Sequence, residues 1–158
     1  MDFYKVPIGF GLALSANAAA MMCVMQNQKM DMMCYYDARI GTSIYGGMFH
    51  PMSYEPLCTY YSFKAFGTLY ALGTQIACNC DCDHVYTLAA TDGEKTGILI
   101  SNTGPDTELS LPGILPTDAY LIDEDHFMTP TELDPQQFLL KENQVLYIEA
   151  AHTEPSSL

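Results

Sequence analysis

The sequence is short of positive charge. Only 6 of its 158 residues are Lys or Arg, against 19 Asp and Glu, and the formal net charge is -13 at pH 7. A surface this acidic repels the phosphates of nucleic acids and of anionic lipids. No stretch interleaves basic with aromatic residues, as nucleic-acid-binding segments do. These absences argue against nucleic acid and anionic membrane as partners, and they leave neutral ligands such as sugars open.

The sequence also lacks a long uninterrupted apolar run. Its longest apolar stretch, residues 6–25, contains Asn17 and is rich in Ala, so no membrane-spanning helix is expected. Residues 6–14 are similar to the apolar core of a secretory signal and 16–18 to a cleavage site, but the segment before them has no net positive charge. We therefore favour a buried Ala-rich helix and a cytoplasmic protein, with secretion as the alternative.

The charge that is present lies in one half. Residues 1–80 hold four acids and four bases, whereas residues 81–158 hold fifteen acids and two bases. Sulfur is distributed the other way, because nine of ten Met precede residue 53 and all six Cys precede residue 83. The composition predicts two units that meet near residue 80: a first unit at 1–80, a second at 81–151, and a frayed tail at 152–158.

Cysteines are concentrated in one segment. Residues 78–84 contain three Cys, two Asp and one His, and in an extended chain the three thiols would share one side with His84. Thiolate and imidazole are zinc and iron ligands, but structural zinc sites use paired knuckles, and no second pair follows. We expect a Cys-rich linker with no metal and no cofactor, and a metal-binding protein stays an open alternative. Cys23 and Cys34 are expected to pack as small hydrophobes.

Two helices and one strand are predicted in the first half. Residues 12–27 are apolar nearly all round, which predicts a helix buried on more than one side. The apolar run 30–36 predicts a buried parallel strand. A loop rich in Gly and aromatic residues at 40–55 is of the kind that contacts ligands. Residues 56–73, with a wide aromatic face, predict the second helix.

The second half reads as short strands. Residues 85–89 and 97–101 flank an Asp92-Gly93 turn, which predicts a hairpin. Three further strands are predicted at 108–111, 119–122 and 144–149. The sequence thus predicts an α+β chain, with a small antiparallel sandwich whose acids lie on the wet face. One strand cannot form a parallel sheet, and both helices would face nothing, so the first half is predicted to be a piece of something larger or to self-associate.

Three segments of the first half, 33–39, 45–49 and 55–73, and two of the second half follow one another in a recognisable order and spacing. Together they resemble glycoside hydrolase family 39-like enzymes, which include β-xylosidase-like and α-L-iduronidase-like activities. The three segments of the first half look like the end of that family's catalytic barrel. The downstream segments 86–90 and 97–102 look like its C-terminal β-sandwich. The resemblance implies that residues 1–80 are the remnant of a (β/α)8 barrel, with its eighth strand at 30–36.

The resemblance also implies where catalysis would occur. Family members are retaining glycosidases with one Glu as acid/base after strand four and another as nucleophile after strand seven. Both positions would lie upstream of this sequence, so no catalytic residue is expected in it and the chain alone is expected to be inactive. Asp37 and Glu55 are not expected to replace the missing pair, because a Glu before a helix-starting Pro typically caps that helix or complements its dipole.

Four residues are candidates for contact with carbohydrate in a complete barrel. Asp37 and Arg39, at the end of the implied strand, could bond sugar hydroxyls, and the rings of Tyr45 and Phe49 could stack on a sugar face. The alternative is that Asp37 pairs with Arg39 to pin the loop while the two rings pack it down. Both readings stay open for the charged pair, and packing is favoured for Phe49. Residues 123–126 are expected to form a solvated turn with a surface histidine.

The leading hypothesis is the C-terminal fragment of a retaining, xylosidase-like glycoside hydrolase. The alternative is a stand-alone carbohydrate-binding or interaction module built on residues 84–150, with self-association through the exposed barrel remnant.

Overall fold

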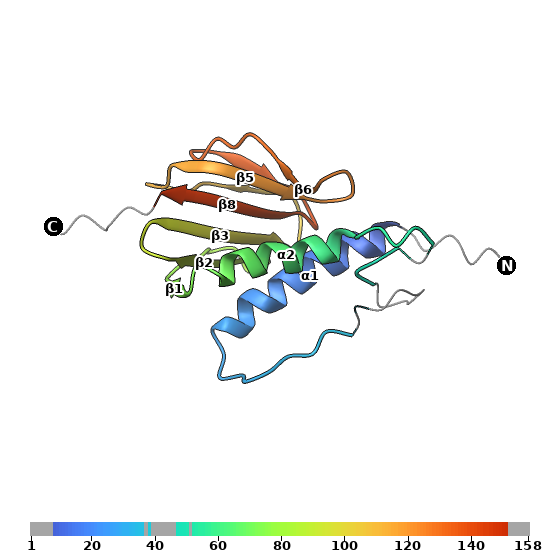
Figure 1. Cartoon of the computed structure of the whole chain (residues 1–158). Helices are drawn as coiled ribbons and strands as arrows, with labels where there is room; N and C mark the ends of the chain where they lie inside the picture. The colour runs from blue at the N-terminus through green and yellow to red at the C-terminus, as the bar shows by residue number, and fades with distance from the viewer. Residues whose placement is uncertain (1–7, 37, 39–46, 51, 152–158) are drawn as a thin grey trace.

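The computed structural model describes residues 8–36, 38, 47–50 and 52–151. It contains two helices, α1 (Ile8–Gln26) and α2 (Cys58–Tyr70), and strands that form a six-stranded and a two-stranded sheet, as Figure 1 shows. The strands are β1 (Thr74–Ile76), β2 (Val85–Thr91), β3 (Lys95–Asn102), β4 (Thr107–Leu109), β5 (Pro116–Ile122), β6 (Phe127–Pro130), β7 (Phe138–Leu140) and β8 (Val145–Ala151). The predicted α+β class is confirmed at this level.

The large sheet has the strand order β1-β2-β3-β8-β5-β6, and all of its pairings are antiparallel. The predicted hairpin of β2 and β3 is confirmed. Its turn is set locally, because Asp92 Oδ1 accepts hydrogen bonds from the backbone N–H groups of Glu94 and Lys95, and Gly93 takes a positive φ of 95°. The three further predicted strands correspond to β4, β5 and β8.

Each face of the large sheet is covered. On one face α1 and α2 lie side by side (Figure 1), and their core includes Ala19, Leu69, Leu99 and Tyr147. On the other face the ribbon of β4 and β7, with the irregular segments around it, closes a second core that includes Ile100, Leu140 and Ile148. Coverage of both faces explains why the residues of β3 are buried without alternation, from Thr96 to Asn102.

Helix α1 is confirmed as a helix buried on more than one side. Ala16, Ala18, Ala19 and Ala20 are all buried, because small side chains let α2 and the sheet approach closely. Two polar contacts fix the helix in place: the hydroxyls of Ser15 and Ser62 lie 2.7 Å apart between the helices, and Ser101 Oγ donates to the carbonyl of Ala16 at 2.7 Å. The expectation that both helices would face nothing is therefore wrong.

Helix α2 is shorter than predicted at both ends. Leu57 is its N-cap and contributes no side-chain capping bond, so the expected capping by Glu55 is wrong. Pro56 lies before the helix, where it forms an antiparallel bridge with Phe49. The helix ends at Tyr70 with Ala71 as its C-cap, and Gly73, the predicted stop, follows two residues later with a positive φ of 87°. No described helix is long and apolar enough to cross a membrane.

The predicted buried parallel strand at 30–36 is wrong. These residues join neither sheet, and Met30, Met32 and Tyr36 are exposed. Cys34 is exposed as well, in contrast to the packed thiol expected there. The physical reason is that a strand needs a neighbouring strand for its backbone groups, and neither of the two described sheets includes this segment. Domain boundaries stay a prediction, although β1, which precedes residue 80, pairs with β2, which follows it.

Candidate functional site

Three of the four predicted sugar contacts, Asp37, Arg39 and Tyr45, lie outside the described residues. The fourth, Phe49, is half-buried, and its ring centroid lies 5.6 Å from that of Tyr60 on α2. The assignment of these four residues as sugar contacts therefore stays a prediction.

Glu55 belongs to a small polar turn before α2. Its Oε2 accepts a hydrogen bond from Ser53 Oγ at 2.7 Å. The ring of His50 closes the same turn, because its Nδ1 accepts the backbone N–H groups of Met52 and Ser53 at 3.3 and 3.1 Å. These bonds give His50, Ser53 and Glu55 a structural role within the turn. Among the described residues, these bonds bring no second carboxylate to Glu55.

A larger polar network lies at the turn that joins β5 to β6. Asp123 begins this turn, and its Oδ1 accepts the backbone N–H groups of Asp125 and His126, both at 3.0 Å. An Asp at the first position of a turn makes such bonds to its own backbone. The ring of His126 folds back so that its Nδ1 lies 2.6 Å from the same oxygen. The turn was predicted to be solvated, but the side chain of Asp123 is only 14% exposed.

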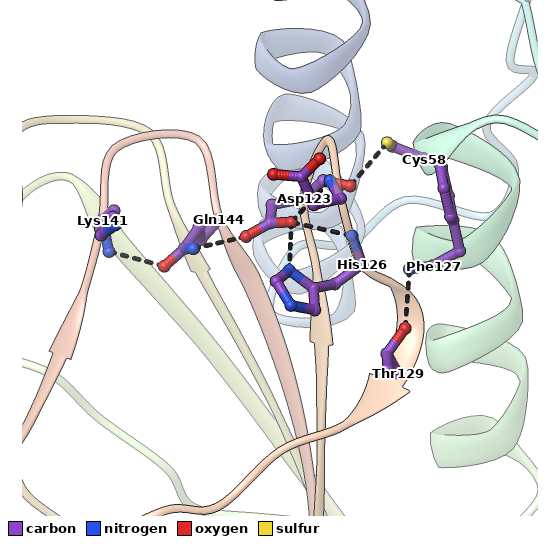
Figure 2. A network of polar contacts seen from close by, with 8 residues as sticks. Cys58, Asp123, His126, Phe127, Thr129, Lys141 and Gln144 are labelled. Atoms are coloured by element: carbon purple, nitrogen blue, oxygen red, sulfur yellow. Dashed lines mark hydrogen bonds and ion pairs between the residues drawn. The ribbon is translucent and has the colours of Figure 1, made fainter.

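Residues distant in sequence complete the network, as Figure 2 shows. Gln144 donates from Nε2 to the second oxygen of Asp123 at 2.7 Å and accepts the backbone N–H of Lys141 at 2.9 Å. From the helical side, Cys58 Sγ donates to the Asp123 carbonyl at 3.1 Å. Asp123 therefore joins the β5–β6 turn, the β7–β8 turn and the start of α2. Nothing in the sequence signalled these contacts, because the partners lie 21 and 65 residues away.

The electrostatics of Asp123 reflect two opposing effects. Partial burial opposes its ionisation, but the hydrogen bonds from His126, the Asp125 backbone and Gln144 outweigh burial and hold the Asp123 pKa below its ordinary value. Burial raises the pKa of the neighbouring Cys58 thiol to about 11, and the charges of Asp123 and Glu124 add to that effect. At neutral pH the pair is therefore a carboxylate beside an unreactive thiol.

A cleft of about 520 Å³ opens beside this network on the ribbon side. Leucines and one phenylalanine line it together with Asp, Glu, His, Lys, Gln and Thr residues. The lining residues are Leu121, Asp123, Glu124, Asp125, His126, Thr131, Glu132, Leu133, Phe138, Leu139, Leu140, Lys141, Glu142, Gln144 and Leu146. This volume falls in the range of small-molecule sites, and its mixed lining can bind a polar molecule with an apolar face.

The cysteine-rich segment has the predicted alternation. Cys78, Cys80 and Cys82 are each half-buried between exposed residues, and all three pack against the core on the ribbon side. Burial raises the pKa of the Cys78 thiol. His84 instead places its Nε2 2.8 Å from Thr107 Oγ1. Among the described residues, no group of His, Cys, Asp or Glu could hold a metal ion.

The comparisons with known proteins give a fold and no family. No protein-family model matches the sequence, and no curated protein matches it. One similar solved structure is a family 30 subfamily 8 xylanase from Clostridium acetobutylicum. The match covers 89% of this chain and 39% of the xylanase chain, at 14% sequence identity and a TM-score of 0.64. A glucosidase from Croceicoccus marinus matches 91% of this chain with 42% of its own, at 17% identity and a TM-score of 0.65.

A third solved structure is similar at greater distance. A family 44 xyloglucanase from Paenibacillus polymyxa matches 87% of this chain with 29% of its own, at 9% identity and a TM-score of 0.60. The chain thus spans less than half the length of each of these proteins. The likeness shows that the chain has the fold of a part of glycoside hydrolases of families 30 and 44. It does not point to family 39 in particular.

Proposed function

We propose that this chain is the sandwich-bearing part of a retaining glycoside hydrolase that cleaves O-glycosidic bonds in xylose-containing substrates. The observation that carries the proposal is the likeness of about nine tenths of the chain to parts of a xylanase and a glucosidase. The segments that resemble family 39 support the same class from the sequence. We also propose that the hydrolase belongs to family 39 and has a xylosidase-like specificity.

We propose further that the chain alone does not hydrolyse glycosides. Retention needs two carboxyl groups about 5–5.5 Å apart, one of which is a general acid with a raised pKa. Asp123 has the opposite shift, since its hydrogen bonds lower its pKa, and those bonds occupy both of its oxygens. Glu55 is bonded to Ser53. Neither carboxylate is therefore suited to the role of the acid.

Activity measurements test the inactivity. The full chain is incubated with an aryl β-xyloside, and release of the phenol is compared with a blank without protein. We expect the two rates to be equal. Release above the blank that is lost in Glu55→Gln or in Asp123→Asn would show that the chain carries its own catalytic carboxylate.

The DNA sequence tests the relation to a longer hydrolase. We expect the region immediately upstream to encode, in frame, a barrel with two glutamates at strand ends. A stop codon and promoter directly before the first codon would contradict the proposal. In the complete protein, Asp37, Arg39 and Tyr45 are the proposed sugar contacts, and Phe49 is proposed to pack the loop, as its contact with Tyr60 favours.

The cleft favours a second candidate, a carbohydrate-binding module. Its Phe138 and leucine walls beside Gln144 and Glu132 combine an apolar surface with hydrogen-bonding groups, as sugar sites require. Titration of the ¹⁵N-labelled chain with a xylo-oligosaccharide tests this reading. We expect shifts of amide signals from residues 131–133 and 138–144. Unchanged spectra, or shifts confined to the helices, would exclude the cleft as a sugar site.

A further inference from the structure

The cysteine-rich segment, residues 78–84, connects β1 to β2, and the function proposed above makes no use of it. Its first residues run beside β2, because the hydroxyl of Thr87 on that strand donates to the Cys78 carbonyl at 3.1 Å. The chain then turns back, and the N–H of Val85 donates to the Cys82 carbonyl at 3.1 Å. The segment is therefore held at two points by the strand that follows it.

Two thiols of the segment share one side of the chain. Cys80 and Cys82 are both half-buried, whereas the residues on either side of each are exposed. Both cysteines pack against the core on the ribbon side. Residues two apart in an extended strand have Cα atoms about 6.6 Å apart, and the chain bends at Asp81, which shortens that separation. The two residues are therefore spaced as a disulfide requires, with about 4.4–6.8 Å between Cα atoms.

Side-chain contacts distinguish this pair from the third cysteine of the segment. Partial burial and a hydrogen bond with the Cys80 side chain raise the pKa of the Cys82 thiol. The Cys78 thiol instead has its hydrogen bond with Thr87, although burial raises its pKa overall. Cys80 and Cys82 thus interact with each other, while Cys78 interacts with β2.

We propose that Cys80 and Cys82 form a redox-active dithiol, which a small-molecule disulfide such as oxidised glutathione converts reversibly into an intrachain disulfide. One cysteine, as its thiolate, attacks a sulfur of the oxidant, forms a mixed disulfide and releases the first small thiol. The second protein thiolate attacks the protein sulfur of that mixed disulfide and releases the second small thiol. Two electrons pass to the oxidant, and the two protons end on the released thiols. The dithiol does not depend on the glycosidase assignment.

Peptide mass spectrometry of the full chain tests the bridge. The reduced protein is incubated with oxidised glutathione, free thiols are blocked, and the chain is cleaved before Asp81, which separates Cys80 from Cys82. We expect the two fragments to stay joined, with two hydrogen atoms fewer than the reduced fragments, and to separate after reduction. Fragments that separate without a reductant would overturn the proposal.

Serine variants identify the two members of the bridge. Cys78→Ser should keep the bridge, whereas Cys80→Ser and Cys82→Ser should stop at the mixed disulfide and retain one glutathione on the remaining cysteine of the pair. Cys34→Ser is the control, since Cys34 is exposed and lies outside the segment, and it should form the same bridge as the parent chain. Circular dichroism checks that the variants keep the fold. A bridge that is lost in Cys78→Ser, or that forms undiminished in Cys82→Ser, would contradict this pairing.

The charge around the pair adds a preference for cationic oxidants. Asp81 lies between the two cysteines and is exposed, so its carboxylate attracts a cationic disulfide such as cystamine and repels anionic oxidised glutathione. At low salt, Asp81→Asn should lower the ratio of the cystamine rate to the glutathione rate by about twofold or more. Glu94→Gln removes the same charge beyond the other end of β2 and should leave the ratio unchanged. An equal ratio in the parent chain and in Asp81→Asn would overturn this preference.

Discussion

Asp123 shows how one carboxylate can organise a turn, two sheets and a helix. It accepts hydrogen bonds from His126, Gln144 and its own turn, and its carbonyl accepts the thiol of Cys58. The bond to the His126 ring is short, at 2.6 Å, and the others are between 2.7 and 3.1 Å. Because they converge on one residue, replacing it should affect all of them. A partly buried carboxylate with several donors costs little to keep ionised, whereas the same donors left without it would be poorly satisfied.

Replacing Asp123 should change both stability and its dependence on acid. The pKa of Asp123 is lowered in the folded state, whereas in the unfolded chain it is about 3.9. Its stabilisation is therefore complete above that value and is lost as the pH falls through the lower folded-state pKa. In Asp123→Asn we expect this part of the acid dependence to vanish and the free energy of unfolding at neutral pH to fall by about 1–3 kcal/mol.

Urea unfolding from neutral pH down to acid pH measures both effects. The control is Asp125→Asn, which removes a charge from an exposed residue in the same turn. We expect that variant to stay within about 0.5 kcal/mol of the parent protein. A loss in Asp125→Asn as large as that in Asp123→Asn would mean that the net charge of the turn, and not the hydrogen bonds of Asp123, is responsible.

Elements that depend on neighbouring residues could be predicted from the sequence. The β2–β3 hairpin follows from one Asp-Gly turn, and α1 follows from its Ala-rich run. The strand expected at 30–36 failed because strand pairing is a property of two segments, and the sequence of one segment does not reveal whether its partner is present. The strands β1, β6 and β7 are three or four residues long, too short to show a period. The cleft was missed because separate segments form its walls.

The contact between the two helices makes a testable prediction. Ser15 and Ser62 are both buried, and their hydroxyls bond to each other. Removing one hydroxyl leaves the other buried with one partner fewer, so Ser15→Ala or Ser62→Ala should each lower the free energy of unfolding by about 1–3 kcal/mol. The double variant should lose less than the sum of the two single losses, because no orphaned hydroxyl remains.

Denaturant unfolding of the four proteins gives the coupling energy. Thr68→Ala serves as the control, since Thr68 bonds only the carbonyl of Lys64, four residues before it on the exposed side of α2. Additive losses in the double variant would indicate that the two hydroxyls contribute independently and that their bond is not what joins the helices.

For the whole molecule, the separation of charge is the dominant property. Fifteen acids share residues 81–158 with two bases. Among the described residues, the one contact at ion-pair distance is between His126 and Asp123, and no lysine lies at that distance from a carboxylate. Mutual repulsion among them favours the unfolded chain, in which the charges lie farther apart. The helical layer belongs to the half with equal numbers of acids and bases, so it has no such net repulsion.

Salt should therefore stabilise this protein. The screening length falls from about 30 Å at 0.01 M to about 10 Å at 0.1 M, which weakens repulsion among the acids of residues 81–158. We expect the urea midpoint to rise with sodium chloride over this range, and the rise to be smaller in Glu132→Lys and Glu142→Lys. These midpoints are compared at one protein concentration, because self-association would also affect them. A midpoint that falls with salt would mean that attractions dominate.

The place of β8 in the strand order has a consequence for synthesis. It is the last strand along the described chain, yet it lies in the middle of the large sheet, between β3 and β5. While the chain is being made, the β2–β3 hairpin and the β5–β6 pair can form early, but nothing can join them until residues 145–151 have emerged. A nascent chain halted shortly before that point would hold two separate halves of a sheet, each with an open edge.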